Sequence, residues 1–188
     1  MAREGIRSFL AIELSKTLKQ EALSFVETIQ DQYSNFRFLP IENWHLTLHF
    51  LGQINPDQLK SLQLELPKAV AQIKPFSISL EDLGAFPKKF PRVLWLGVAG
   101  DRDGLLALKK CLDQILKKLH FEIETRPYHP HITIARSKGE SKQTFLAPKQ
   151  EFESKNFDKI HSVTLFQSIL SPQGSSHSPL GVFLLGSS

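Results

Sequence analysis

The stretch HLTL at residues 45–48 decides the fold, because it recurs as HITI at residues 131–134. Both copies alternate polar and apolar residues, which is the pattern of a β-strand with one buried face. Side chains at i and i+2 of a strand share a face about 6.8 Å apart, so each histidine should point the same way as its threonine. The sequence therefore predicts two strands whose aliphatic residues enter the core and whose polar faces meet solvent or a ligand.

The two histidines of these motifs, His45 and His131, suit chemistry on a phosphodiester. In-line displacement at phosphorus needs a base to take a proton from the nucleophile and an acid on the opposite side to protonate the leaving oxygen. Histidine, with an ordinary pKa of about 6.5, can fill either role near neutral pH. The hydroxyls of Thr47 and Thr133 could donate hydrogen bonds to the non-bridging oxygens. Neither role requires a metal ion, so we expect neither a metal nor a cofactor.

Two other interpretations of the repeated motif stay open. The strands could be ordinary ones with half-exposed polar faces. Alternatively, His49 shares a strand face with His45, and His129 repeats that spacing beside His131, so four histidines could converge on a metal ion. Neither motif contains a carboxylate, and Pro130 separates the second pair, which both count against the metal site.

Outward from the motifs, apolar periodicity predicts a mixture of strands and helices. Strands are expected at residues 6–14, 44–51, 76–83, 92–99, 121–124, 131–135, 161–170 and 180–185. Helices are expected from the N-cap Ser15 to about residue 33, from Asn55-Pro56 to about Pro67, which should end or kink the helix, and from residues 101–103 to about 119. The polar stretch 137–159 is expected to be a long connection.

The order of these elements favours an α+β fold. Each half of the chain has a helix, then a turn, then a strand with a His-x-Thr triplet, which suggests two related lobes that face one another. Intercalated antiparallel strands with two or three helices fit this order better than a regular alternation of parallel strands and helices. With 188 residues, 41% of them hydrophobic, we expect residues 1–188 to form a single domain made of the two lobes.

Composition excludes some function classes and favours few. The net charge of +4 suits an anionic partner, but 23 basic against 19 acidic residues is only a mild excess. The single cysteine, Cys111, can form neither an internal disulfide nor a cysteine-based zinc site. No apolar run approaches the roughly 18 residues of a membrane span, and the N-terminus lacks the apolar stretch of a secretory signal. We therefore expect a cytoplasmic protein with no membrane partner.

The motifs and their surroundings resemble the two-histidine (2H) phosphoesterase superfamily, and within it the LigT-like RNA 2',3'-cyclic phosphodiesterases of the 2'-5' RNA ligase family. The resemblance covers nearly the whole chain. Besides the two tetrapeptides, it rests on RSFLAIEL (7–14), NWHLTLHFLG (43–52), PRVLWLGV (91–98), RPYHPHITIAR (126–136) and VTLFQSILSPQG (163–174).

The resemblance implies a bilobal LigT-like fold, in which two pseudo-twofold-related lobes of antiparallel strands have helices outside and a central cleft between them. It implies hydrolysis of a terminal 2',3'-cyclic phosphate to a 2'-phosphomonoester, and 2'-5' RNA ligation in reverse. By the family pattern, His45 is the proton donor to the departing 3'-oxygen and His131 is the proton acceptor that activates water. The nearly symmetric motifs do not decide between these roles. At 174–177 this chain has GSSH where relatives often carry an aromatic residue.

Five further residues are candidates for the substrate site. Arg126 lies five residues before the second motif and could bind a phosphate oxygen, and Arg136 follows the motif as a weaker candidate. Arg7 could face the cleft from the first strand. Phe38 and Trp44 could stack on a nucleobase, although aromatic residues beside a strand are more often part of the core.

The leading hypothesis is thus an RNA 2',3'-cyclic phosphodiesterase whose partners are RNA ends with a cyclic phosphate or cyclic nucleotides. We expect a monomer without an obligatory protein partner. A non-catalytic module that binds RNA ends or nucleotides is the alternative from another class, because the same hydrogen bonds would serve plain binding. A hydrolase of 2'-5' oligonucleotides or small cyclic phosphates is the second enzymatic alternative.

Overall fold

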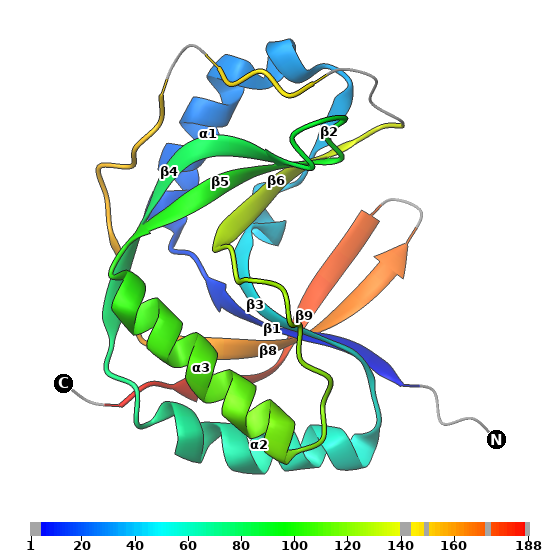
Figure 1. Ribbon diagram of the computed structural model, residues 1–188, viewed down its shortest axis with the longest axis vertical. Coiled ribbons are helices and arrows are strands. Elements are labelled where there is room, and N and C mark those ends of the chain that lie inside the picture. The colour runs from blue at the N-terminus through cyan, green and yellow to red at the C-terminus, as the bar shows by residue number, and fades with distance from the viewer. Residues whose placement is uncertain (1–4, 140–143, 149–150, 172–173, 187–188) are drawn as a thin grey trace.

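The computed structural model describes residues 5–139, 144–148, 151–171 and 174–186 (Figure 1). The strands are β1 (Ile6–Glu13), β2 (Phe36–Phe38), β3 (His45–Ile54), β4 (Phe76–Phe86), β5 (Val93–Gly100), β6 (His131–Ser137), β7 (Asp158–Ile160), β8 (Ser162–Ser171) and β9 (Gly174–Leu184). The helices are α1 (Lys16–Ile29), α2 (Pro56–Val70) and α3 (Arg102–Lys118), with short 3-10 turns at Gln30–Tyr33 and Ile41–Asn43.

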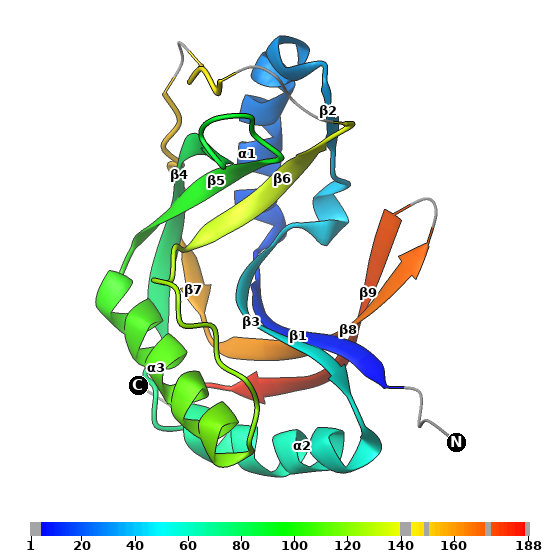
Figure 2. The ribbon, with the colours of Figure 1, turned by 45° about the vertical axis from the view of Figure 1, so that its right-hand side comes forward.

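The described strands form one antiparallel sheet in the order β7-β4-β5-β6-β3-β1-β8-β9, with β2 paired to β6. The sheet is strongly curled, as Figures 1 and 2 show. The two motif-bearing strands, β3 and β6, are neighbours at its centre, so each half of the sheet contributes one motif. This arrangement confirms the predicted α+β fold with two halves of antiparallel strands.

The helices cover one side of this sheet and begin at capping side chains. Ser15 accepts a hydrogen bond from the backbone of Leu18 at the start of α1, and Asp101 accepts one from Gly104 at the start of α3. Asn55 forms a capping box with Gln58 at the start of α2, in which the side chain of each residue accepts a hydrogen bond from the backbone N–H of the other. In Figures 1 and 2, α2 and α3 lie side by side below the sheet and α1 lies behind β4 and β5.

The aliphatic residues of both motifs belong to the main core, as predicted from their alternation. Leu46, Ile132 and Ile134 are fully buried, and Leu48 is nearly so. Their histidines and threonines are only half-buried. The polar residues of the motifs therefore lie on the sheet face that the helices leave open.

Pro67 does not end α2, contrary to one of the two outcomes expected from the sequence. The helix continues to Val70 with the proline inside it. Leu62, Leu66 and Val70 are fully buried along one stripe that crosses the proline position. Burial of this stripe offsets the backbone hydrogen bond that a proline removes.

The strand expected at residues 121–124 is wrong, because this segment is irregular. Phe121 and Ile123 alternate as in a strand, but they pack against the core without pairing to the sheet. Conversely, the structure contains two strands that the sequence did not predict, β2 and β7. Each has three residues, which is too short for a period-2 pattern to appear. In the part of the chain that the structure describes, no helix is long and apolar enough to cross a membrane.

Candidate active site

The two tetrapeptides meet at the centre of the sheet in equivalent positions. Leu46 of β3 pairs with Ile132 of β6 in an antiparallel bridge. These are the second residues of their motifs, so the local arrangement has twofold symmetry about the bridge. His45 and His131 flank this pair diagonally and lie on the face opposite the two buried aliphatic side chains. Two histidines that are 86 positions apart in sequence thus share one face of one strand pair.

A β-bulge follows the first motif and changes which residues share its face. Along β1, Leu10 pairs with His49 and Ala11 with Thr47, so Leu48 has no partner. The extra residue reverses the alternation beyond it. His49 therefore turns to the helix side and is 5% exposed, whereas Phe50 emerges on the face of His45 and is 70% exposed.

The same bulge follows the second motif. Along β5, Leu94 pairs with Ala135 and Trp95 with Thr133, so Ile134 has no partner. Ala135 is then fully buried, and Arg136 emerges exposed on the face of His131. The pseudo-symmetry thus extends past the motifs and places Phe50 and Arg136 at equivalent positions.

An aromatic cluster surrounds His45. Its ring stacks on Phe9 at a centroid distance of 4.8 Å and meets the His177 ring edge-on at 5.0 Å. Phe9 in turn stacks on Phe166 at 5.2 Å. Burial and the neighbouring His177 lower the pKa of His45 to about 4, partly opposed by a hydrogen bond with the backbone of Asn43. In the free protein at neutral pH, His45 is therefore uncharged.

A second cluster surrounds His131. Its ring lies 5.2 Å from Phe86 and 6.0 Å from Trp95 between centroids. Its Nδ1 is 2.7 Å from the carbonyl oxygen of His129. A carbonyl only accepts, so in the neutral ring Nδ1 carries the hydrogen and Nε2 keeps a free lone pair. Burial, His129 and Arg136 lower the pKa of His131, although the carbonyl hydrogen bond opposes them.

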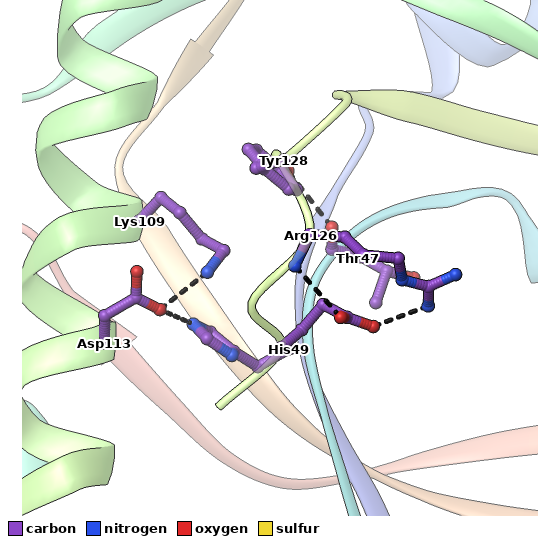
Figure 3. A network of polar contacts seen from close by, with 7 residues as sticks. Thr47, His49, Lys109, Asp113, Arg126 and Tyr128 are labelled. Atoms are coloured by element: carbon purple, nitrogen blue, oxygen red, sulfur yellow. Dashed lines mark hydrogen bonds and ion pairs between the residues drawn. The ribbon is translucent and has the colours of Figure 1, made fainter. Parts of the chain in front are cut away.

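A buried polar network connects α3 to the first motif (Figure 3). The Nε2 of His49 and the Nζ of Lys109 both lie 2.6 Å from one carboxylate oxygen of Asp113. The ammonium of Lys109 is 5.5 Å from the ring centre of Tyr128, whose hydroxyl donates a 3.1 Å hydrogen bond to the carbonyl of Thr47. Tyr128 precedes His131 by three residues, so this bond joins the approach to the second motif directly to the first.

This network overturns the expectation that His49 shares a strand face with His45. The bulge at Leu48 points His49 at Asp113. His49 thus points away from the open sheet face that carries His45 and His131, which we call the motif face. Among the described residues, no three His, Cys, Asp or Glu side chains gather where they could hold a metal ion. The four-histidine metal site considered from the sequence therefore has no geometric support.

The other candidates occupy different environments. Arg126 is exposed and forms a 2.5 Å ion pair with Glu124 (Figure 3), so its role in phosphate binding stays a prediction. Arg7 is exposed on β1. Trp44 is 1% exposed and donates its indole N–H to the carbonyl of Leu39, so the stacking role considered for it is wrong. Phe38 is half-buried and packs against the main core.

Sequence reasoning missed the aromatic residues around the histidines. Phe9 and Phe166 lie in two of the strands expected from the sequence, and with Ala11 they form a small cluster separate from the main core. His177 stood out only as a departure from the family pattern. The position of Phe50 on the motif face could not be predicted because the bulge leaves no mark in the polar and apolar alternation.

Comparisons with known proteins agree with this arrangement. Residues 19–165 match the model of the 2'-5' RNA ligase superfamily. The chain is 30% identical to an RNA 2',3'-cyclic phosphodiesterase of Methanothermobacter thermautotrophicus, over 96% of this chain and 99% of the relative. It is 32% identical to an RNA 2',3'-cyclic phosphodiesterase of Methanocaldococcus jannaschii, over 90% of this chain and 95% of that relative. The crystal structure of E. coli LigT in its apo form superposes with a TM-score of 0.78 at 27% identity, covering 97% of this chain and 99% of that one.

Proposed function

Because the chain belongs to the 2'-5' RNA ligase superfamily, we propose that it hydrolyses terminal RNA 2',3'-cyclic phosphates to 2'-phosphomonoesters. The observation that carries the proposal is the bridge between Leu46 and Ile132, which brings His45 and His131 to one open sheet face. The names of the curated relatives supply the substrate class.

In the proposed reaction, His131 is the base. Its Nε2 takes a proton from water, whose oxygen attacks phosphorus in line with the 3'-oxygen. The P–O3' bond breaks, and His45 gives its proton to the departing 3'-oxygen. The product carries a 2'-phosphate and a 3'-hydroxyl. Each proton transfer contributes roughly 10²- to 10⁴-fold to the rate.

The tautomer of His131 supports this assignment of roles. Its Nδ1 is engaged with the carbonyl of His129, which leaves Nε2 as the free base. His45 must be protonated to act as the acid, and its pKa of about 4 keeps it neutral in the free protein. The negative charge of a bound cyclic phosphate raises that pKa, so substrate binding itself loads His45 with its proton.

Thr47 and Thr133 are the proposed donors to the non-bridging oxygens, because each lies two residues along the strand from its histidine and shares its face. These steps use no metal ion or cofactor, so a chelator should leave the rate unchanged. Run in reverse, the same acid and base would close a 2'-phosphate and the neighbouring 3'-hydroxyl to the cyclic phosphate with release of water. With the 5'-hydroxyl of a second RNA in place of water, attack on the cyclic phosphate would form a 2'-5' linkage, while the P–O3' bond breaks and His45 protonates the 3'-oxygen. We also propose a cytoplasmic monomer without an obligatory protein partner, and size-exclusion chromatography tests the oligomeric state.

Product analysis on defined oligonucleotides tests the proposal. A short RNA with a 2',3'-cyclic phosphate is incubated with the protein with and without EDTA, and the product is identified by ³¹P NMR and by its resistance to a 3'-specific phosphatase. We expect a 2'-phosphomonoester at equal rates in both. Tight binding without product would favour the non-catalytic module, and turnover of cyclic mononucleotides or 2'-5' linkages alone would favour the small-substrate hydrolase.

A further inference from the structure

Two arginines face each other directly across neighbouring strands. Arg37 of β2 is the cross-strand partner of Arg136 of β6. Directly opposite residues of an antiparallel pair project from the same face, with Cβ atoms about 5 Å apart. Both side chains are exposed. In the described part of the chain, neither has a carboxylate within ion-pair distance.

This pairing has a cost that the fold does not explain. Like charges directly opposite each other in a sheet destabilise it. β2 has only three residues, and its neighbours Phe36 and Phe38 supply its packing against the core. The positive charge at Arg37 therefore adds nothing to the burial that holds β2 in place. An anion between the two guanidinium groups would turn the repulsion into two charge-assisted contacts.

The arginine pair continues the motif face of β6. The bulge at Ile134 returns Arg136 to the face of His131, and the charge of Arg136 contributes to the lowered pKa of that histidine. His131 and Arg136 are five residues apart, but the bulge absorbs one of them, so four residue steps separate the two along β6. At the usual rise of a strand this corresponds to about 13 Å. In Figures 1 and 2, β2 lies beside the outer end of β6, where β3 has turned away.

We propose that Arg37 and Arg136 bind the phosphodiester that joins the terminal nucleotide of the RNA to its 5' neighbour. Arginine is suited to this because its planar fork can donate two parallel hydrogen bonds to a phosphate. This inference rests on the proposed function and deepens it. It makes the preferred substrate an oligonucleotide with at least one linkage before the cyclic phosphate, and it sets the direction in which the RNA leaves the histidines, along β6 toward β2.

The test compares two substrates that differ by this linkage: adenosine 2',3'-cyclic phosphate and the dinucleotide ApA with a terminal 2',3'-cyclic phosphate. Arg37→Ala should lower kcat/KM for the dinucleotide about tenfold and leave the mononucleotide unchanged. For the dinucleotide, it should also reduce the slope of log kcat/KM against log salt concentration by about one, the change expected when one contact between a cation and a phosphate is lost. A dinucleotide with a neutral methylphosphonate linkage should be processed equally by the wild type and by Arg37→Ala.

Arg102→Ala is the matched control, because Arg102 is an exposed arginine on α3 outside the motif face. It should behave as wild type with all three substrates. Thermal unfolding at low salt checks the fold: Arg37→Ala should be at least as stable as wild type, because a repulsive pair is removed. Equal effects of Arg37→Ala on mononucleotide and dinucleotide, or no effect on either, would overturn the inference.

The same comparison can be made without turnover, which separates this inference from the proposed function. Isothermal calorimetry measures binding of the two products, adenosine 2'-phosphate and the dinucleotide with a 2'-phosphate. Arg37→Ala should weaken the binding of the dinucleotide product about tenfold and leave the binding of adenosine 2'-phosphate unchanged. If the wild type hydrolyses the mononucleotide but Arg37→Ala binds both products normally, the proposed function stands and the arginine site is wrong.

Discussion

At the scale of single residues, the two histidines are made different by their surroundings although their motifs are nearly identical. His131 has Nδ1 engaged with a backbone carbonyl at 2.7 Å, which fixes a tautomer with a free Nε2. His45 lies among Phe9, Phe166 and His177, where burial lowers its pKa to about 4. The environment rather than the sequence of the motif therefore distinguishes the two histidines, as their proposed roles of base and acid require.

The lowered pKa values predict the pH dependence of the free enzyme. An acid must be protonated and a base must be deprotonated, so kcat/KM should be bell-shaped, with both limbs below about pH 6.5, the ordinary value for histidine. The profile of kcat should lie at higher pH, because bound anionic substrate raises the pKa of His45. Steady-state rates from pH 3.5 to 9 check this. A kcat/KM that stays flat up to pH 8 would contradict the assignment of His45 as the acid.

At the scale of elements, matching bulges after the two motifs set the character of the site. The first residue after each motif, His49 or Ala135, is turned to the buried side of the sheet by the bulge. The next residue, Phe50 or Arg136, returns to the face that carries the histidines. One half of the site thereby gains an aromatic side chain, Phe50, and the other gains a cation, Arg136. Two equivalent backbones thus carry different side chains in the two halves of the proposed site.

The hydrogen bond between Tyr128 and Thr47 connects the two motifs, and its removal should affect catalysis. Tyr128→Phe should lower kcat about tenfold with little change in KM, because Thr47 loses the contact that fixes it relative to His131. The matched control is Tyr33→Phe, which also removes a tyrosine hydrogen bond to a backbone carbonyl, that of Leu146 at 2.7 Å. Both variants should lose about 1 kcal/mol of stability, but only Tyr128→Phe should lose activity. Equal kcat values in the two variants would show that the bond is merely structural.

The sequence predicted most of the elements but not where the alternation breaks. The apolar stripe of α3 and the alternation of both motifs were sufficient, because amphipathic burial has a regular period in each. The bulge at Leu48 was invisible, since an extra aliphatic residue looks like a continued strand, and His49 was therefore placed on the wrong face. The strand predicted at Phe121 and Ile123 was wrong for the converse reason. Their alternation is explained by packing against the core, without pairing to any strand.

At the scale of the whole molecule, the sheet places distant segments around one face. The order β6-β3-β1-β8 brings His131, His45, Phe9 and Phe166 onto successive neighbouring strands, although they span 158 positions of sequence. Single-strand patterns carry no information about such an order. The two histidine motifs were predicted because they repeat, whereas the aromatic partners of His45 became apparent only from the sheet.

Buried histidines also make the fold sensitive to acid. The pKa values of His45 and His49 are lowered to about 4, whereas in the unfolded chain each is near 6.5. Between these values the unfolded chain binds protons that the folded protein does not, so stability is complete above pH 6.5 and falls as the pH drops toward 4. The slope should be up to roughly 1.4 kcal/mol per pH unit for each histidine.

Urea unfolding at pH 7, 6 and 5 measures this dependence. His49→Gln should flatten it, because one of the histidines that gain a proton on unfolding is gone. The control, His161→Gln, changes an exposed histidine and should keep the wild-type slope. A His49→Gln variant with the full wild-type slope would show that His49 is not held neutral in the folded protein.

The central claim is that two histidines act as acid and base on one phosphate, and one kinetic comparison tests it most directly. Turnover by His45→Ala and His131→Ala is measured on an RNA 2',3'-cyclic phosphate and on its analogue with sulfur at the 3'-bridging position, a leaving group that needs no proton. Both variants should lose at least about 10²-fold with oxygen, and only His45→Ala should recover with sulfur. Wild-type turnover of the oxygen substrate by either variant would contradict the account.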